Sequence, residues 1–192
     1  MQLFVRLTNN SNSMKHKLRS EISKIRTEYS EDQFKEFSAD IFKTLEQTQV
    51  FSDAKCILAY YSFPGEVFTH DFIEKHSEDK TIILPVVQND ILVLREFNGV
   101  QNLKKSKFGI LEPVGKDFTD FSKIDLAIIP GMSFDRDLNR LGRGKAYYDN
   151  LLPKLSAYLI GVCFSFQLKE KVPVESHDIP MNCVISQDQI VL

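Results

Sequence analysis

The chain has 192 residues with 24 lysines and arginines against 26 aspartates and glutamates, so its formal net charge is −2. This length is typical of one sizeable domain with its own core, and the near balance of charge excludes a general attraction to a nucleic-acid backbone. With 43% hydrophobic residues and no repeat or biased tract, the composition also excludes a disordered or fibrous protein.

The first thirteen residues, MQLFVRLTNNSNS, differ in character from the rest of the chain. Their short apolar patch is broken by Arg6 and leads into a run of asparagine and serine, which is too short and too polar for a secretory signal. We expect residues 1–13 to be a disordered extension, or Met14 to be the native start. Residues 14–192 are expected to form a single domain.

Two helices are expected next along the chain. Leu18, Ile22 and Ile25 recur at the spacing of one helical face, which predicts a helix that begins near Lys15. The tetrapeptide SEDQ, which begins at Ser30, has the form of a capping box, and apolar residues continue at helical spacing behind it. They predict a second helix of about four turns.

From residue 54 onward, strand-sized apolar runs alternate with helix candidates. Strands are expected in residues 56–63, 81–87, 91–97, 124–134, 158–164 and 183–192, with a hairpin turn at 88–90 and a short helix at 68–76. Thr69 is the expected cap of that helix, and Pro85 indicates an edge or a bulge in its strand. None of the apolar runs approaches the roughly 20 residues of a membrane span.

The alternation predicts an α/β fold, a three-layer α/β/α sandwich with a mostly parallel central sheet. Ligands of such sheets gather at the carboxyl ends of the strands, where the segments SFPGE and PGMSFD begin. Cys56, Cys163 and Cys183 lie far apart in apolar sequence, which indicates buried thiols in a reducing cytoplasm rather than disulfides. The histidines show no zinc-binding spacing.

The segment NRLGRGKAYYDN, residues 139–150, concentrates cations and glycines behind a predicted strand. Arg140, Arg143 and Lys145 are interleaved with glycines, which let a backbone approach an anion closely. A helix that starts at about Gly144 would add its positive end, an arrangement that favours a triphosphate. The segment matches neither common phosphate-loop pattern, so a charged surface loop followed by an ordinary amphipathic helix stays an alternative.

Asp149 is the expected metal ligand of this segment. It is four residues from Lys145, so both would share one helix face. From there Asp149 would reach a divalent cation held by the same phosphates. A solvent-facing ion pair between the two side chains is the alternative.

Residues 130–149, PGMSFDRDLNRLGRGKAYYD, resemble the signature of the 5-formyltetrahydrofolate cyclo-ligases, also called methenyltetrahydrofolate synthetases. In that family a PG-x-x-FD element leads into RLGRGxGYYD, and order and spacing agree here throughout. Leu138 and Ala146 stand where the family usually has glycine. An alanine inside the helix would cost little, whereas a position that needs a positive φ would be strained.

Three further segments resemble elements of the same family. KHKLR is similar to an amino-terminal element that implies phosphate contacts for Lys15 and Arg19, although on their own these are typical of an exposed helix face. SFPGEV resembles the segment that holds the folate, with Tyr61 and Glu66 at substrate positions. VPVESHD resembles a late element whose aspartate, here Asp178, helps to hold magnesium.

The resemblance implies a ligase of folate and one-carbon metabolism that depends on ATP and Mg²⁺. ATP would phosphorylate the formyl oxygen of 5-formyltetrahydrofolate or its polyglutamates, and ring closure would yield 5,10-methenyltetrahydrofolate, ADP and phosphate. Catalysis would come from positioning and charge neutralisation, with Arg143 and Lys145 as catalytic residues. The protein is expected to be a cytoplasmic monomer without nucleic acid or membrane as a partner.

The implied site residues fall into sets for ATP, folate and metal. The ATP set is Lys15, Arg19, Arg140, Gly142, Arg143, Gly144, Lys145, Ala146, Tyr147 and Tyr148; the folate set is Tyr61, Glu66, Arg143, Gly144, Lys145, Ala146 and Tyr147; the metal set is Asp149 and Asp178.

Two other functions stay open. A domain that binds a nucleotide or phosphate without catalysis would account for the departures at Leu138 and Ala146. A sugar-phosphate isomerase-like or acyl-transfer enzyme on a similar fold would account for the basic loop, but not for Lys15, Arg19 and Asp149 together.

Overall fold

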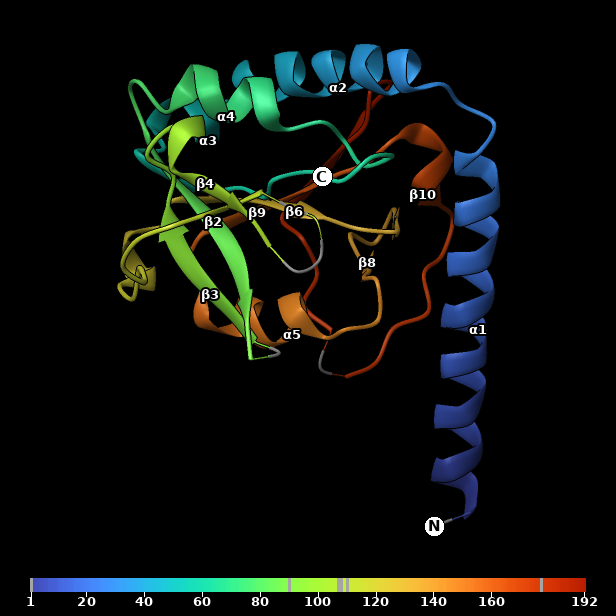
Figure 1. Cartoon of the computed structure of the whole chain (residues 1–192). Helices are drawn as coiled ribbons and strands as arrows, with labels where there is room; N and C mark the ends of the chain where they lie inside the picture. The colour runs from blue at the N-terminus through green and yellow to red at the C-terminus, as the bar shows by residue number, and fades with distance from the viewer. Residues whose placement is uncertain (1, 90, 107–108, 110, 177) are drawn as a thin grey trace.

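A seven-stranded sheet forms the middle layer of the computed structural model, which describes residues 2–89, 91–106, 109, 111–176 and 178–192. Its strands lie in the order β12 (Ile190–Val191), β11 (Cys183–Ile185), β9 (Tyr158–Val162), β6 (Leu126–Pro130), β1 (Cys56–Leu58), β2 (Thr81–Gln88) and β3 (Ile91–Glu96). Neighbouring strands from β11 to β2 are parallel, and the edge strands β12 and β3 are antiparallel to their neighbours. The predicted, mostly parallel α/β sheet is confirmed (Figure 1).

Helices cover both faces of this sheet. On one face lie α2 (Glu31–Glu46), α3 (Gln49–Asp53) and α4 (His70–His76), and on the other α5 (Tyr147–Leu151) and the 3₁₀ helix η3 (Leu152–Lys154) (Figure 1). Successive side chains of each strand point to opposite faces of the sheet. Ile57 and Ile128 accordingly belong to the first buried cluster, and their neighbours Leu58 and Ile129 belong to the second.

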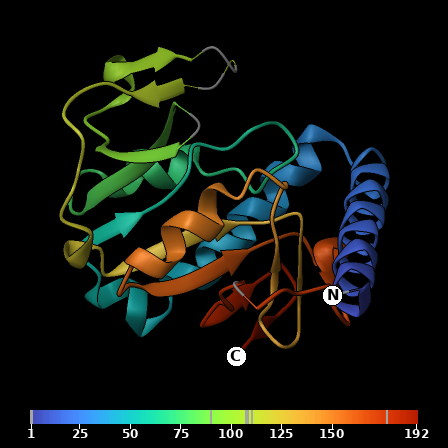
Figure 2. The same cartoon turned by 90° about the horizontal axis from the view of Figure 1, so that it is seen from below.

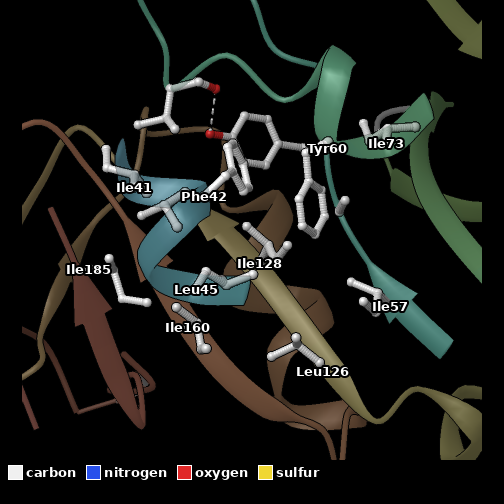
Figure 3. Close-up of a cluster of buried hydrophobic side chains, with 14 of the residues drawn as sticks. Ile41, Phe42, Leu45, Ile57, Tyr60, Ile73, Leu126, Ile128, Ile160 and Ile185 are labelled. Atoms are coloured by element: carbon white, nitrogen blue, oxygen red, sulfur yellow. Dashed lines mark hydrogen bonds between the residues drawn. The ribbon is translucent and has the colours of Figure 1, made fainter. Parts of the chain in front are cut away.

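The first of these clusters joins α2 to the sheet. Figure 3 shows Leu45 of α2 beside Ile128 and Ile160 of the central strands, and Ile41 of α2 belongs to the same cluster. The hydroxyl of Tyr60 is buried beside them and donates a 3.0 Å hydrogen bond to the carbonyl of Val67. This bond ties the chain that leaves β1 to the segment that enters α4.

The long helix α1 (Gln2–Arg26) lies at the side of the sheet rather than over a face (Figures 1 and 2). It packs on a small sheet of β10 (Leu168–Lys169), β7 (Ser133–Asp135) and β8 (Arg140–Leu141), where Ile22 is fully buried. The predicted helix start near Lys15 is wrong, because α1 begins at Gln2. The division of the chain at residue 13 stays a prediction.

The capping box is confirmed, and Thr69 stands at the expected N-cap position of α4, although its side chain makes no capping hydrogen bond. The amide of Gln33 donates to Ser30 Oγ over 3.2 Å, and the amide of Ser30 donates to Gln33 Oε1 over 2.9 Å. Thr69 makes no such bond, because its hydroxyl donates to the carbonyl of Tyr60 and accepts from the amide of Ser62. The Thr69 side chain therefore fixes the segment after β1 instead of the helix end.

Most of the strands are shorter than predicted, although β2 runs one residue further, to Gln88. The first ends at Leu58 instead of residue 63, and residues 183–192 divide into the antiparallel pair β11 and β12. The hairpin of β2 and β3 is confirmed, although residue 90 of its turn lies outside the described residues. Pro85 falls beyond the stretch of β2 that pairs with β1, so its missing N–H leaves no ladder bond unmade.

The remaining elements are short connections and one satellite hairpin. They are the 3₁₀ helices η1 (Val100–Asn102), η2 (Phe121–Lys123) and η4 (Ser165–Gln167), and the paired strands β4 (Leu103–Lys105) and β5 (Leu111–Pro113). Within the described ranges, none of the helices combines the length and the apolar character that a membrane span requires.

The cysteines are free and buried, as predicted. Burial raises the pKa of Cys56 and of Cys183 to about 11, so both thiols stay protonated at neutral pH. They behave as small apolar side chains of the core.

Candidate functional site

A cavity of about 560 Å³ opens at the carboxyl ends of β1, β2 and β6. The segment after β1, the β2–β3–β5 wall and the loop between β6 and α5 line it: Tyr60, Tyr61, Phe63, Glu66, Pro85, Val87, Leu92, Leu111, Glu112, Pro130, Gly131, Arg140, Gly142, Arg143, Gly144, Lys145, Ala146, Tyr147, Tyr148 and Asp149. The two segments that were expected at strand ends therefore meet in one cavity.

Asp135 organises the loop that carries the cationic residues. This side chain is fully buried, and its carboxylate accepts hydrogen bonds from the amides of Asp137, Asn139 and Val172 and from the Asn139 side chain, over 2.8–3.1 Å. The bonds fold residues 135–139 into a tight turn in which Leu138 has a φ of 65°. The turn thus fixes the position at which Arg140 begins β8 beside the cavity.

Arg140 points inward and holds Asp149. Its Nη2 donates to Asp149 Oδ1 over 2.5 Å, and its Nη1 donates to the carbonyl of Pro130 over 3.3 Å. The guanidinium also lies over the ring of Tyr148, 5.4 Å from its centre. The expected partnership of Lys145 with Asp149 on one helix face is wrong, because Lys145 precedes the helix.

Ala146 occupies a left-handed turn ahead of α5. The predicted helix start at Gly144 is wrong: α5 begins at Tyr147, and Ala146 has φ 54° and ψ 14° at the N-cap. Gly144, with φ 89°, supplies a second positive φ in the same loop. Ala146 and Leu138 are thus both strained at positions where the family signature has glycine, since a left-handed backbone costs a residue with a Cβ about 1–2 kcal/mol.

Ala146→Gly is expected to raise the free energy of unfolding by up to about 1 kcal/mol, because the relief of left-handed strain exceeds the added flexibility of the unfolded chain. Urea unfolding followed by far-ultraviolet circular dichroism measures the change. Ala39→Gly, at an exposed position inside α2, is the matched control and should lower stability by about 1 kcal/mol. Equal losses in both variants would contradict a strained Ala146.

Glu66 and Arg143 bridge the two halves of the cavity. Glu66 Oε1 accepts from Arg143 Nη2 over 2.6 Å and from Nε over 3.0 Å, and Oε2 accepts from the amide of Phe63 over 2.9 Å. The Glu66 side chain is only 10% exposed, whereas that of Arg143 is 47% exposed. The arginine is therefore the partner that is free to move toward a ligand.

Lys145, Tyr147 and Tyr148 complete this side of the cavity. Lys145 is exposed, and no ion pair among the described residues involves it. Burial, followed by the charge of Glu66, raises the pKa of Tyr148 well above its usual value against the effect of Arg140, so its hydroxyl stays protonated. The ring of Tyr61 stacks on His70 with 3.7 Å between centres.

Lys15, Arg19 and Asp178 lie outside the lining of the cavity. Arg19 Nε donates to the carbonyl of Gly142 over 2.9 Å and so supports the loop from behind. Lys15 Nζ donates to Asp178 Oδ2 over 2.9 Å and to Glu175 Oε2 over 3.0 Å. Burial lowers the pKa of Lys15, but the bonds to Asp178 and Glu175 outweigh burial, so the net effect raises that pKa. The proposed phosphate contacts of Lys15 and Arg19 and the metal contact of Asp178 stay predictions.

Several residues of the site were missed from the sequence. The cavity wall formed by Pro85, Val87 and Leu92 has only the pattern of an ordinary strand pair. Asp135 stands inside the signature, but a lone aspartate does not show how many amides it will accept from. In VPVESHD, residue 177 lies outside the described residues.

The comparisons with known proteins agree with this geometry. Residues 11–187 match the sequence profile of the 5-formyltetrahydrofolate cyclo-ligase family. The 5-formyltetrahydrofolate cyclo-ligase of Mus musculus is 28% identical over 92% of this chain and 95% of that protein, and that of Escherichia coli K12 is 31% identical over 71% of this chain and 80% of that protein. The solved structure of Aquifex aeolicus 5,10-methenyltetrahydrofolate synthetase has a TM-score of 0.83 at 30% identity, covering 92% of this chain and 91% of that one. The chain therefore belongs to the 5-formyltetrahydrofolate cyclo-ligase family.

Proposed function

We propose that this protein converts 5-formyltetrahydrofolate and ATP into 5,10-methenyltetrahydrofolate, ADP and phosphate. The observation that carries the proposal is the meeting of Tyr61 and Glu66 with the glycine-rich loop around Lys145 in a single cavity. The segment after β1 offers the cavity a carboxylate and an aromatic ring, and the glycine-rich loop offers cations. A substrate with a heteroaromatic ring and a co-substrate with phosphates fit these two parts of the lining, the folate end and the phosphate end.

The folate end is built for a ring that carries N–H groups. Glu66 is held in place by the amide of Phe63 and by Arg143, and a carboxylate has about four acceptor positions, so it can still accept from a pterin. Tyr61 offers a ring face whose orientation is set by His70. We infer that these two side chains orient the folate with its formyl group toward the glycine-rich loop.

The phosphate end supplies charge rather than a covalent partner. The formyl oxygen is a weak nucleophile, so catalysis requires that it be held in line with the γ-phosphate while charge moves toward ADP. Arg143 and Lys145 are exposed on the loop and are proposed to neutralise this charge, Arg143 through a bidentate grip and Lys145 as a point charge. The positive φ of Gly144 turns the loop so that its backbone can approach the phosphates.

One carboxylate of the cavity fits a divalent cation. No group of three or more potential metal ligands occurs among the described residues, but Mg²⁺ typically takes one or two carboxylates and completes its shell with phosphate oxygens and water. Asp149 lines the cavity next to the loop and is proposed to hold Mg²⁺, which when bound would neutralise phosphate charge. The part proposed for Asp178 rests on the sequence resemblance alone.

Polyglutamate forms of the folate are proposed as substrates too. Lys104 and Lys105 are exposed on β4, directly opposite Glu112 and Leu111 of the cavity wall. They offer positive charge beside the cavity to an anionic tail.

The compartment and the oligomeric state are further parts of the proposal. The free, buried thiols favour a reducing compartment such as the cytoplasm. A monomeric state stays a prediction.

The purified protein is expected to generate the ultraviolet absorbance of 5,10-methenyltetrahydrofolate when it is mixed with Mg²⁺, ATP and 5-formyltetrahydrofolate. Omission of ATP or addition of a chelator should abolish the change. If the protein binds 5-formyltetrahydrofolate in calorimetry but yields no absorbance change, the cavity binds without catalysing the reaction and the proposal fails.

A further inference from the structure

Arg26, the last residue of α1, lies behind the turn that carries Glu66. Figures 1 and 2 show the segment between β1 and α4 reaching toward the junction of α1 and α2. Gly65 in this segment packs so closely on the Arg26 stem that an added Cβ would lie 2.7 Å from Arg26 Cδ and 3.5 Å from Nε. Gly65 also has a φ of 79°, so both its backbone and its neighbour demand glycine.

The Arg26 guanidinium makes few hydrogen bonds within the described part of the chain. Its buried Nε has no hydrogen-bond partner within the described part of the chain, and its Nη2 makes only a 3.9 Å contact with the sulfur of Met132. A buried donor without a partner is rare and calls for a functional explanation. Burial and then the nearby charge of Arg143 lower the pKa of Arg26, and Glu66 and Tyr60 act in the opposite direction, so Arg26 shares its surroundings with the bridging pair.

Glu66 therefore has cations on two sides. Arg143 faces it from the glycine-rich loop, and Arg26 stands behind its turn, which closes through the bond from the Glu66 amide to the Phe63 carbonyl over 3.0 Å. The two cations differ in mobility. Arg143 is exposed on a loop, whereas the stem of Arg26 is pressed against Gly65 at the end of a long helix.

We propose that Arg26 is a positioning residue for folate binding: it seats the Phe63–Glu66 turn and remains beside Glu66 as its cation when Arg143 turns to the nucleotide. This inference rests on the proposed function. A phosphate that Arg143 grips bidentately through Nε and Nη2 takes the place of the Glu66 carboxylate, because these two nitrogens make both of its bonds to Glu66. A second cation, whose stem packs against Gly65, keeps the Glu66 carboxylate oriented in the complex with both substrates.

The test compares Arg26→Met, which keeps most of the stem and removes the charge, with Arg26→Lys and with Lys24→Met. Lys24 is exposed in the same last turn of α1 and is the matched control. Calorimetry measures the Kd of 5-formyltetrahydrofolate for each variant with and without a bound, non-hydrolysable ATP analogue and Mg²⁺. Steady-state assays measure the KM of each substrate.

Arg26→Met is expected to raise the folate Kd about tenfold when the analogue is bound and less than about threefold when it is absent. Its KM for ATP should stay near that of Lys24→Met, and Arg26→Lys should recover most of the folate affinity. A scaffold residue would weaken binding equally in both states, and that result, or a folate Kd unchanged in both, overturns the proposal. If the wild-type protein binds folate but shows no turnover, the proposed reaction is wrong, whereas the comparison of folate affinities among the Arg26 variants can still be made.

Discussion

Lys145→Ala is expected to lower kcat by about a hundredfold or more, in line with the removal of one preorganised charge from a transition state. Lys145 is exposed on the cavity loop and belongs to none of the ion pairs of the described residues, so its charge is available to the transferring phosphoryl group. The KM for 5-formyltetrahydrofolate should change less than kcat, because Glu66 and Tyr61, the proposed folate contacts, keep their own partners. The methenyl absorbance assay under saturating substrates measures the effect.

Lys154→Ala is the matched control for this experiment, since Lys154 is exposed in η3 and does not line the cavity. Its kcat should equal that of the wild type. Lys145→Arg should recover part of the rate, because it keeps the charge but not the compact ammonium group. A Lys145→Ala variant as active as Lys154→Ala would make Lys145 an ordinary surface residue.

Asp135→Ala is expected to lower the free energy of unfolding by at least about 3 kcal/mol, because it leaves several buried donors without an acceptor. Those donors are the amides of Asp137, Asn139 and Val172 and the side chain of Asn139. Turnover should also fall, because the turn positions Arg140, and Arg140 in turn holds Asp149 through its hydrogen bond. Urea unfolding gives the stability, and the absorbance assay gives the rate.

Asp137→Ala provides the comparison for the same turn. The Asp137 side chain is 68% exposed and lies 4.0 Å from Lys171, a separation at which a surface pair contributes little. Its loss should change stability by less than about 0.5 kcal/mol. An Asp135→Ala variant as stable as Asp137→Ala would show that the buried carboxylate does not hold the loop.

The layers of the fold could be predicted because they depend on local patterns. The Ser30 box contains its own hydrogen-bond partners within four residues, and the apolar runs of the central strands report burial directly. Element ends were less predictable. The strand expected over residues 56–63 stops at Leu58, where the chain turns to wrap the cavity, although its aromatic residues continue the pattern of a strand.

Part of the predicted site comes together in the structure, since Tyr61, Glu66 and residues 142–149 line one cavity, whereas Lys15, Arg19 and Asp178 do not line it. Individual roles could not be predicted. Arg140 and Lys145 look alike as cations in the sequence, yet Arg140 is buried against Asp149 and Lys145 is exposed. Burial separates a structural cation from one that is available to a ligand, and the spacing of charges does not encode it.

By itself, therefore, the sequence determined the class of fold, the family and the two segments that meet at the strand ends, because neighbouring residues specify helices, strands and motifs. Only the tertiary structure decided which charges pair, since Glu66 and Arg143 are 77 residues apart and Lys15 and Asp178 are 163 apart. It also decided that the methyl group of Ala146 sits in a left-handed turn rather than inside a helix. Each of these outcomes depends on the space left by distant segments, which no local pattern contains.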